Sequence, residues 1–128
     1  MSIEQIRTDP DPYEPFRLSQ AMRVGELLFV SGQAAISPEG ELVGIGDFDA
    51  QAEQTFRNLE RVLEAGGSGL DRVVKVTIFL TDVDDRPLIN PLRQEAFGSA
   101  RPASTLVEVS RLVLPEAKVE IECVALVP

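Results

Sequence analysis

The 128-residue sequence predicts one α+β domain, residues 1–128, with a mixed sheet and two helices on one face. Its length is near the commonest domain size, and no repeat or linker divides it. Strand-like and helix-like patterns follow one another in the order β-β-α-β-α-β-β. Two helices can cover only one face of such a sheet, yet several strands carry apolar residues on both faces. We therefore expect another copy of the chain to cover the second face.

The N-terminal part predicts an arm and two strands. Three prolines between positions 10 and 15 indicate that residues 1–15 form an extended arm rather than a helix. Two strand-like runs follow between Leu18 and Ser31, on either side of Val24-Gly25-Glu26. Residues 34–48 are rich in Gly, Pro and acidic residues, which predicts an excursion containing turns.

The middle of the chain contains the clearest local patterns. Between Asp49 and Ala65, apolar residues recur at steps of four, three and four, which predicts one face of a helix. Asp47 or Asp49 can cap its start, and Gly66-Gly67 can end it. A strand is predicted from Val73 to Leu80, because its β-branched content is high. We expect one face of this strand to carry Val74, Val76, Ile78 and Leu80.

A second helix and two strands are predicted in the last third. Pro87 and Pro91 lie four residues apart, so we expect a short turn and then a helix that starts at Pro91 with Asn90 as its N-cap. Strands are expected at about 104–110 and 118–127. In the last strand, Val119, Ile121 and Cys123 should point one way, and Glu120 and Glu122 the other way with Val124 and Leu126.

Composition excludes several classes of function. The chain has no histidine, which removes His-based triads, His-driven ribonuclease chemistry and almost every zinc site with a histidine ligand. Its net charge is −9 and no run of Lys or Arg occurs, so nucleic-acid binding is disfavoured. No stretch approaches the roughly 20 apolar residues that span a bilayer, and the N-terminus does not resemble a signal peptide. We expect a cytoplasmic protein with no membrane partner.

The single cysteine and the single tyrosine are not expected to react. Cys123 lies in an alternating apolar run, which favours a buried structural thiol, and one cysteine allows no intrachain disulfide. Tyr13 lies in the N-terminal arm, where we expect it to be mobile. A carboxylate is therefore the remaining candidate for a general acid or base in the C-terminal strands.

The run RPASTLVEVSRLVLPEAKVEIECVAL resembles the signature of the Rid (YjgF) family of reactive imine deaminases. Ser19-Gln20-Ala21, the run LLFVSGQ, the strand VVKVTIFLTD and the segment around Asn90 are also similar, in the family's order. The resemblance implies a chorismate-mutase-like fold, a homotrimer and a ligand cleft between subunits. It also implies hydrolysis of enamines and imines to ketoacids and ammonia, with neither a metal nor an organic cofactor.

The resemblance makes Glu120 the catalytic candidate, because this residue matches the family glutamate that positions water and moves protons. The pattern alone also makes Glu120 a candidate. If the carboxylate is partly desolvated at an interface, its pKa rises toward a useful acid–base range. The alternative is that Glu120 and Glu122 are solvated residues of an edge strand.

The chain departs from the family at its substrate-binding arginine, where Ser104 stands. Serine cannot make a bidentate ionic contact with a carboxylate, so we expect weaker binding of carboxylate-bearing imines. The family tyrosine is also missing, with Leu18 in its place. Arg17 and Arg101 are two arginines that could compensate, or they are solvated surface residues. Arg93 is a weaker candidate, because it can lie on the exposed side of its helix.

The remaining substrate-binding candidates flank these positions. Ser31 either donates to a ligand or satisfies backbone at the end of its strand. Asn90 matches a family position but also has an explanation as an N-cap. Thr105 and the Leu106 backbone are expected to form walls of the pocket because they flank Ser104. Gly32 is expected to relieve backbone crowding rather than to contact ligand.

Two functions remain open. The first is a hydrolytic deaminase that acts on a small imine, enamine or related C–N compound. The second is a non-catalytic trimer of the same fold that binds a small ligand or regulates. Glu120 favours the first, and Ser104 with Leu18 favours the second. A ribonuclease or translation inhibitor, as names attached to the family suggest, is disfavoured by the charge and by the lack of histidine.

Overall fold

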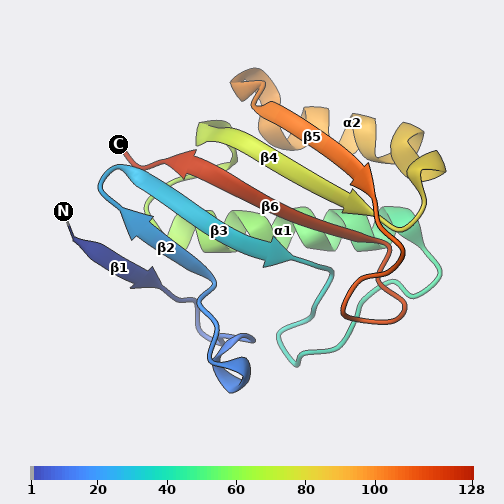
Figure 1. Ribbon diagram of the computed structural model, residues 1–128, viewed down its shortest axis with the longest axis horizontal. Helices are drawn as coiled ribbons and strands as arrows, with labels where there is room; N and C mark the ends of the chain where they lie inside the picture. The colour runs from blue at the N-terminus through green and yellow to red at the C-terminus, as the bar shows by residue number, and fades with distance from the viewer. Residues whose placement is uncertain (1) are drawn as a thin grey trace.

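One six-stranded mixed sheet forms the centre of the computed structural model, which describes residues 2–128. The strand order is β1-β2-β3-β6-β4-β5, and the neighbouring strands are antiparallel except for the parallel pair β4–β5. Two helices lie on one face of the sheet (Figure 1). The α+β class, the mixed sheet and the two helices are thus confirmed. The elements are β1 (Ile3–Ile6), β2 (Ala21–Val24), β3 (Leu27–Gln33), α1 (Phe48–Ala65), β4 (Val73–Leu80), α2 (Arg86–Phe97), β5 (Ala103–Glu108) and β6 (Val119–Leu126).

Helix α1 forms where the apolar spacing predicts it. The Asp47 side chain accepts a hydrogen bond from the Ala50 amide at 3.1 Å, which satisfies one of the free N–H groups of the first turn. Gly66 caps the other end. The buried face packs on the sheet and contains Phe48, Gln51, Ala52, Thr55, Phe56, Leu59, Val62 and Leu63.

The prediction for the second helix is wrong at its start. Helix α2 begins at Arg86 rather than at Pro91, so Asn90 lies inside the helix and is not its N-cap. Pro87 falls in the first turn, where an N–H has no intrahelical partner in any case, and Pro91 removes only one bond farther on. Tertiary packing outweighs that loss, because Ile89 and Phe97 are buried in the core. The rings of Phe97 and Phe56 pack edge to face, with centroids 5.8 Å apart.

The N-terminal segment contains more structure than an extended arm. Strand β1 pairs with β2, so the order of elements has one strand more than predicted, and a short 3-10 helix spans Glu14–Phe16. Strand β1 was not predicted because it lies at the edge of the sheet and is mostly exposed, so its sequence needs no alternation of apolar and polar residues. One residue of β4 is also misplaced in the prediction: Val74 is 49% exposed, because the register with β6 shifts between Val73 and Lys75.

The other strand predictions agree closely with the structure. The hairpin of β2 and β3 turns at Gly25, whose φ of 60° favours glycine. In β6, Val119, Ile121 and Cys123 are buried under the helices, and Glu120 and Glu122 lie on the opposite face. Among residues 2–128, no helix combines the length and apolarity needed to cross a bilayer.

Three long connections meet at one end of the sheet (Figure 1). Strands β1, β3 and β5 all run toward this end. Strands β1 and β3 are both antiparallel to β2, β3 and β4 are both antiparallel to β6, and β5 is parallel to β4. The connections that follow them, residues 7–20, 34–47 and 109–118, therefore gather beside the start of β6. Side chains far apart in the sequence are brought together here.

Buried Gln51 fixes two of these connections to α1. Its Nε2 donates to the Gly44 carbonyl at 3.2 Å and to the Glu116 carbonyl at 3.0 Å, and its Oε1 accepts from the Lys118 amide at 2.8 Å. The Gln51 side chain is completely buried, so these backbone groups have little access to water as a replacement. Gln51 therefore holds the second and third connections in one arrangement.

Replacing Gln51 with Leu should lower the free energy of unfolding by about 2–4 kcal/mol, since three partly buried backbone groups lose their partner. Urea denaturation followed by circular dichroism, at one protein concentration, measures this loss. Gln54→Leu is the matched control, because among residues 2–128 the Gln54 side chain bonds only to Asn58 Oδ1 on the same helix. Equal losses in the two variants would show that the three backbone contacts contribute nothing.

Candidate functional site

A cleft of about 410 Å³, which we call the Glu120 cleft, opens where the three connections meet. Its walls are mostly apolar, and the Glu120 carboxylate is the one acidic group among its lining residues. Among its polar side chains, Ser31 comes from β3, Glu120 from β6 and Tyr13 from the connection of residues 7–20. The lining residues are Pro12, Tyr13, Phe16, Leu18, Ser31, Gly32, Ala34, Ile36, Gly40, Leu112, Val113, Leu114, Ala117 and Glu120.

Strand β6 presents Glu120 on the face of the sheet that the helices leave open. The residue pairs with Phe79 of β4 and is half-buried. Burial raises the pKa of the Glu120 carboxyl above its ordinary value, and the negative charge of Glu122 raises it further. A carboxyl with a raised pKa can both take up and release a proton closer to neutral pH.

An irregularity in β3 makes room for this carboxylate. The register between β3 and β6 shifts between Val30 and Gln33, so one extra residue of β3 is accommodated around Ser31 and Gly32. A Cβ atom on Gly32 would lie 2.4 Å from Glu120 Oε2. Gly32 therefore relieves crowding, but the crowding group is the side chain of the candidate catalytic Glu120 and not backbone as predicted.

Tyr13 enters the same cleft, which corrects the prediction that it lies in a mobile arm. Its hydroxyl donates a hydrogen bond to the Gly32 carbonyl. Burial raises the pKa of Tyr13 to about 12, and the charges of Glu120 and Asp11 add to this effect. The phenol is therefore protonated at neutral pH and acts as a hydrogen-bond donor beside Glu120.

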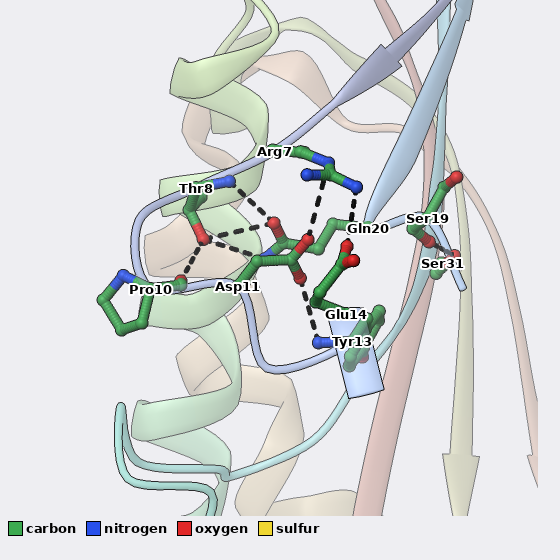
Figure 2. Close-up of polar contacts among 9 residues, drawn as sticks. All are labelled: Arg7, Thr8, Pro10, Asp11, Tyr13, Glu14, Ser19, Gln20 and Ser31. Carbon is green, nitrogen blue, oxygen red and sulfur yellow. Dashed lines mark hydrogen bonds and ion pairs between the residues drawn. The ribbon is translucent and has the colours of Figure 1, made fainter. Parts of the chain in front are cut away.

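Polar contacts hold the connection of residues 7–20 in place (Figure 2). The Arg7 guanidinium lies 2.6 Å from the Glu14 carboxylate, and Asp11 Oδ1 accepts from the Tyr13 amide at 2.9 Å. Buried Gln20 accepts from the Thr8 amide at 2.7 Å. These contacts explain why a proline-rich segment places its tyrosine in a defined position.

The Ser31 hydroxyl contributes to backbone order as well as to the cleft. It donates to the Ser19 carbonyl at 2.6 Å (Figure 2). The Ser31 hydroxyl therefore bonds backbone, which is one of the two interpretations, and the residue also lines the Glu120 cleft. Donation from Ser31 to a ligand stays a prediction.

Ser104 lies in a second cleft of about 310 Å³, which we call the Ser104 cleft. Ser104 is in register with buried Val76 of β4, so its side chain is on the helix side of the sheet. Arg93 Nη1 donates to Ser104 Oγ at 2.9 Å. Within one chain, Ser104 and Glu120 thus lie on opposite faces of the sheet. The lining residues are Val76, Arg93, Gln94, Phe97, Gly98, Arg101, Pro102 and Ser104.

The other predicted site residues line neither cleft. Thr105 accepts from Lys75 Nζ at 2.8 Å, and Leu106 packs against the core. Arg17 is exposed at the end of the 3-10 helix, between the cleft residues Phe16 and Leu18. Asn90 lies in α2, where its Oδ1 is buried and has no hydrogen-bond partner among residues 2–128.

The sequence analysis missed Tyr13 as a cleft residue and ranked Arg93 below Arg17 and Arg101. Tyr13 lies between Pro12 and Pro15. Because proline fixes the backbone φ angle, these two residues restrict the segment, and this restriction was a signal that the segment is ordered. Arg93 follows Asn90 by three residues, which places the two side chains on one side of a helix only if the helix begins before Asn90. The wrong start of α2 concealed this relation.

The fold and clefts define a class of α+β protein in which one mixed sheet carries two helices on one face and a largely apolar cleft with one carboxylate at its loop end. Residues 7–127 match the model of the family described as Endoribonuclease L-PSP. This chain belongs to that family, which is the YjgF/RutC/Rid family, and the predicted resemblance is confirmed.

Similar proteins agree in sequence and in structure. A RutC family protein of Pyrococcus abyssi is 41% identical over 128 residues, which are 98% of each chain. A protein of Dermatophagoides farinae named 2-iminobutanoate/2-iminopropanoate deaminase is 36% identical over 118 residues, 92% of this chain and 90% of that one. The crystal structure of the Rid protein YyfA from Yersinia pestis has a TM-score of 0.91 at 35% identity, covering 98% of this chain and 100% of that chain.

Proposed function

We propose that this protein is a hydrolytic deaminase of small imines and enamines, and that Glu120 is its general acid and base. The observation that carries the proposal is a half-buried carboxylate with a raised pKa in the lining of a largely apolar cleft. The name of the Dermatophagoides farinae relative supports this class of reaction. The experiment that tests it is the release of ammonia from an imine by the wild type and by Glu120→Gln.

The reaction needs one group that moves protons in both directions. The Glu120 carboxylate accepts a proton from water while the water oxygen bonds to the imine carbon. The protonated Glu120 then gives this proton to the nitrogen of the tetrahedral carbinolamine. In the breakdown, the Glu120 carboxylate takes the proton of the hydroxyl group and passes it to the departing nitrogen as the C–N bond breaks. Imine and water thus become a carbonyl compound and ammonia, and Glu120 is a carboxylate again. The apolar walls favour these proton transfers, because they keep the Glu120 carboxyl partly desolvated and so raise its pKa.

Tyr13 supports this assignment as a neutral donor beside the acid. Because its pKa is about 12, the phenol does not compete with Glu120 for protons near neutral pH. Its hydroxyl is fixed on the Gly32 carbonyl, and the Glu120 carboxylate occupies the space that a Cβ on the same glycine would need. We assign Tyr13 the role of closing the cleft against water and holding the Gly32 backbone under Glu120.

We propose a homotrimer with a chorismate-mutase-like arrangement, in which the open faces of the sheets meet. Exposed apolar side chains on the open face support this proposal, because monomeric proteins seldom leave a contiguous apolar face in water. A second copy is the natural cover for such a face. These side chains include Leu27, Phe29, Val107 and Leu126, each at least 38% exposed in the single chain.

Light scattering at micromolar concentration should give about three times the chain mass of 14.0 kDa. Replacing Phe29 with Glu places a charge in the centre of the open face and should shift the mass toward that of one chain. The exposed position of Phe29 means that the fold of a single chain tolerates the change. A wild-type protein that stays monomeric at this concentration would remove the subunit-interface arrangement.

A non-catalytic small-ligand binder is the second candidate. It is favoured by Ser104, which leaves the family's arginine position without a charge, and by the absence of any basic residue among those lining the Glu120 cleft. Ligand binding without turnover of any imine would support this candidate. Cleavage of RNA is disfavoured despite the family's description, because the net charge is −9 and the chain has no histidine. A cytoplasmic location and independence from metals and organic cofactors remain predictions.

A further inference from the structure

Among residues 2–128, the side chains that line the Glu120 cleft offer hydrogen-bond acceptors but no free donor. The Tyr13 hydroxyl donates to the Gly32 carbonyl, and the Ser31 hydroxyl donates to the Ser19 carbonyl at 2.6 Å. Each hydroxyl has one proton, so only its oxygen lone pairs remain for a ligand. The third polar side chain is the Glu120 carboxylate, which only accepts hydrogen bonds when it is ionised.

This set of polar groups does not suit an anionic ligand. A carboxylate ligand accepts hydrogen bonds and donates none, so it needs donors or cations that these side chains do not supply. Turning the Tyr13 hydroxyl toward such a ligand would take the partner away from the part-buried Gly32 carbonyl, which costs free energy. The Glu120 charge would repel the anion as well, and the net charge of −9 adds to this repulsion. The cleft therefore favours a ligand that donates.

Apolar side chains form the rest of the Glu120 cleft and continue to its mouth. Phe16, Leu18 and Val113 all line the cleft, yet these residues are 72%, 58% and 93% exposed in the single chain. They belong to two of the three connections that meet at this end of the sheet (Figure 1). A ligand with an apolar body would remove this surface from water, which favours binding in proportion to the area covered.

We infer that the Glu120 cleft takes imines that carry no carboxylate, in which the C=N–H unit is the only polar group and the remainder is an apolar alkyl or aryl group. This inference rests on the proposed function, since it names the substrate class of that reaction. The imine N–H donates to the Glu120 carboxylate, and the apolar group lies against Leu18 and the other residues of the mouth. Water then converts the imine to an aldehyde or ketone and ammonia.

Three probes with the same aromatic ring test the polar part of this inference without depending on catalysis. They are benzylamine, benzyl alcohol and benzoate, and they are measured by calorimetry on the assembled protein at about pH 8, where an alkyl ammonium group is protonated. The wild type should bind benzylamine about tenfold or more tightly than the other two, because only the ammonium group forms a charge-assisted bond to Glu120. Glu120→Gln should remove this advantage and leave the affinity for benzyl alcohol unchanged.

Glu122→Gln is the matched control for charge, because Glu122 is exposed on the same face of β6 and does not line the Glu120 cleft. It should keep most of the preference for benzylamine. Benzoate that binds as tightly as benzylamine would overturn the inference. Benzylamine that binds Glu120→Gln as tightly as the wild type would overturn it too.

Leu18→Ser tests the apolar part of the inference. It should weaken the binding of benzylamine by about three- to tenfold, because less apolar surface is removed from water. Ile45→Ser is the matched control, since Ile45 is 60% exposed, compared with 58% for Leu18, and does not line the Glu120 cleft. Light scattering on both variants should give the mass of the wild type. Unchanged binding by Leu18→Ser, or its dissociation into single chains, would show that Leu18 does not serve the ligand.

Turnover of two imines separates this inference from the proposed function. The imine of benzylamine, generated in the assay by an amine oxidase with dioxygen as the oxidant, should be hydrolysed with a kcat/KM about tenfold or more above that for 2-iminobutanoate. A higher kcat/KM for 2-iminobutanoate, lost in Glu120→Gln, would contradict the inference and leave the proposed function intact. If neither imine is turned over while benzylamine binding is lost in Glu120→Gln, the proposed function fails and the ligand class stands.

Discussion

Replacing Glu120 with Gln should lower kcat for imine hydrolysis by roughly 10²–10⁴, the usual contribution of a general acid–base group. Glutamine keeps the size of the side chain and its hydrogen-bonding capacity, but it cannot transfer a proton. Ammonia released from an imine generated in the assay measures the loss. The chain has no histidine and Cys123 is buried, so neither residue type replaces the missing proton transfer.

The variant should also remain folded, which separates a chemical defect from unfolding. The pKa of Glu120 is raised in the folded protein, so the charged carboxylate opposes folding at pH values above that pKa. This opposition decreases as the pH falls and the group becomes protonated. The neutral amide removes it, and the thermal midpoint of Glu120→Gln at neutral pH should equal or slightly exceed that of the wild type.

Glu122→Gln provides the control for charge and position. Glu122 lies on the same open face of β6, is exposed and lines the sheet surface rather than the Glu120 cleft. Its removal takes away a charge that raises the pKa of Glu120, so the acidic limb of the pH–rate profile should move to lower pH while the maximal kcat stays close to that of the wild type. Equal turnover by Glu120→Gln and the wild type would remove Glu120 from the mechanism.

Local signals were sufficient for the elements whose packing is periodic. Helix α1 and strands β4 and β6 show clear apolar spacing because each buries one face against the same core, and their predicted bounds agree with the structure to within a residue or two. The burial of Ile121 and Cys123 opposite Glu120 followed from strand alternation alone. The open face of β6 was thereby predicted correctly as the location of the candidate acid.

The site was predicted less completely, because its members meet only through tertiary structure. Tyr13 enters the Glu120 cleft by means of contacts to Asp11 and Gly32, and neither contact has a periodic signal. The Arg93–Ser104 bond joins a helix to a strand across a connection whose course depends on where α2 starts. The local rule that proline begins a helix favoured a start at Pro91. Packing of Ile89 in the core instead extends the helix toward the N-terminus, so that it starts at Arg86.

Replacing Gly32 with Ala should lower kcat by about 10–10² with little loss of stability, since misplacement of a catalytic group by about 1 Å can reduce the rate by this amount. The added Cβ would lie 2.4 Å from Glu120 Oε2 and 2.9 Å from its Cδ, so the carboxylate must move. The end of a glutamate side chain moves at little cost, and Gly32 does not have a positive φ that alanine would strain. Steady-state kinetics and thermal unfolding of the same preparation measure the two effects.

Gly66→Ala is the contrasting variant, because its Cβ would lie 2.7 Å from Leu28 Cδ2. Leu28 is completely buried, so this clash compresses the core and should lower the free energy of unfolding by about 1–3 kcal/mol, with kcat for the folded protein unchanged. A double-mutant cycle then tests the cause of the Gly32 effect. In the Glu120→Gln background, Gly32→Ala should reduce turnover little further, because the group that it displaces no longer transfers protons. A full additional loss in that background would show that alanine at position 32 acts on the cleft by a route other than Glu120.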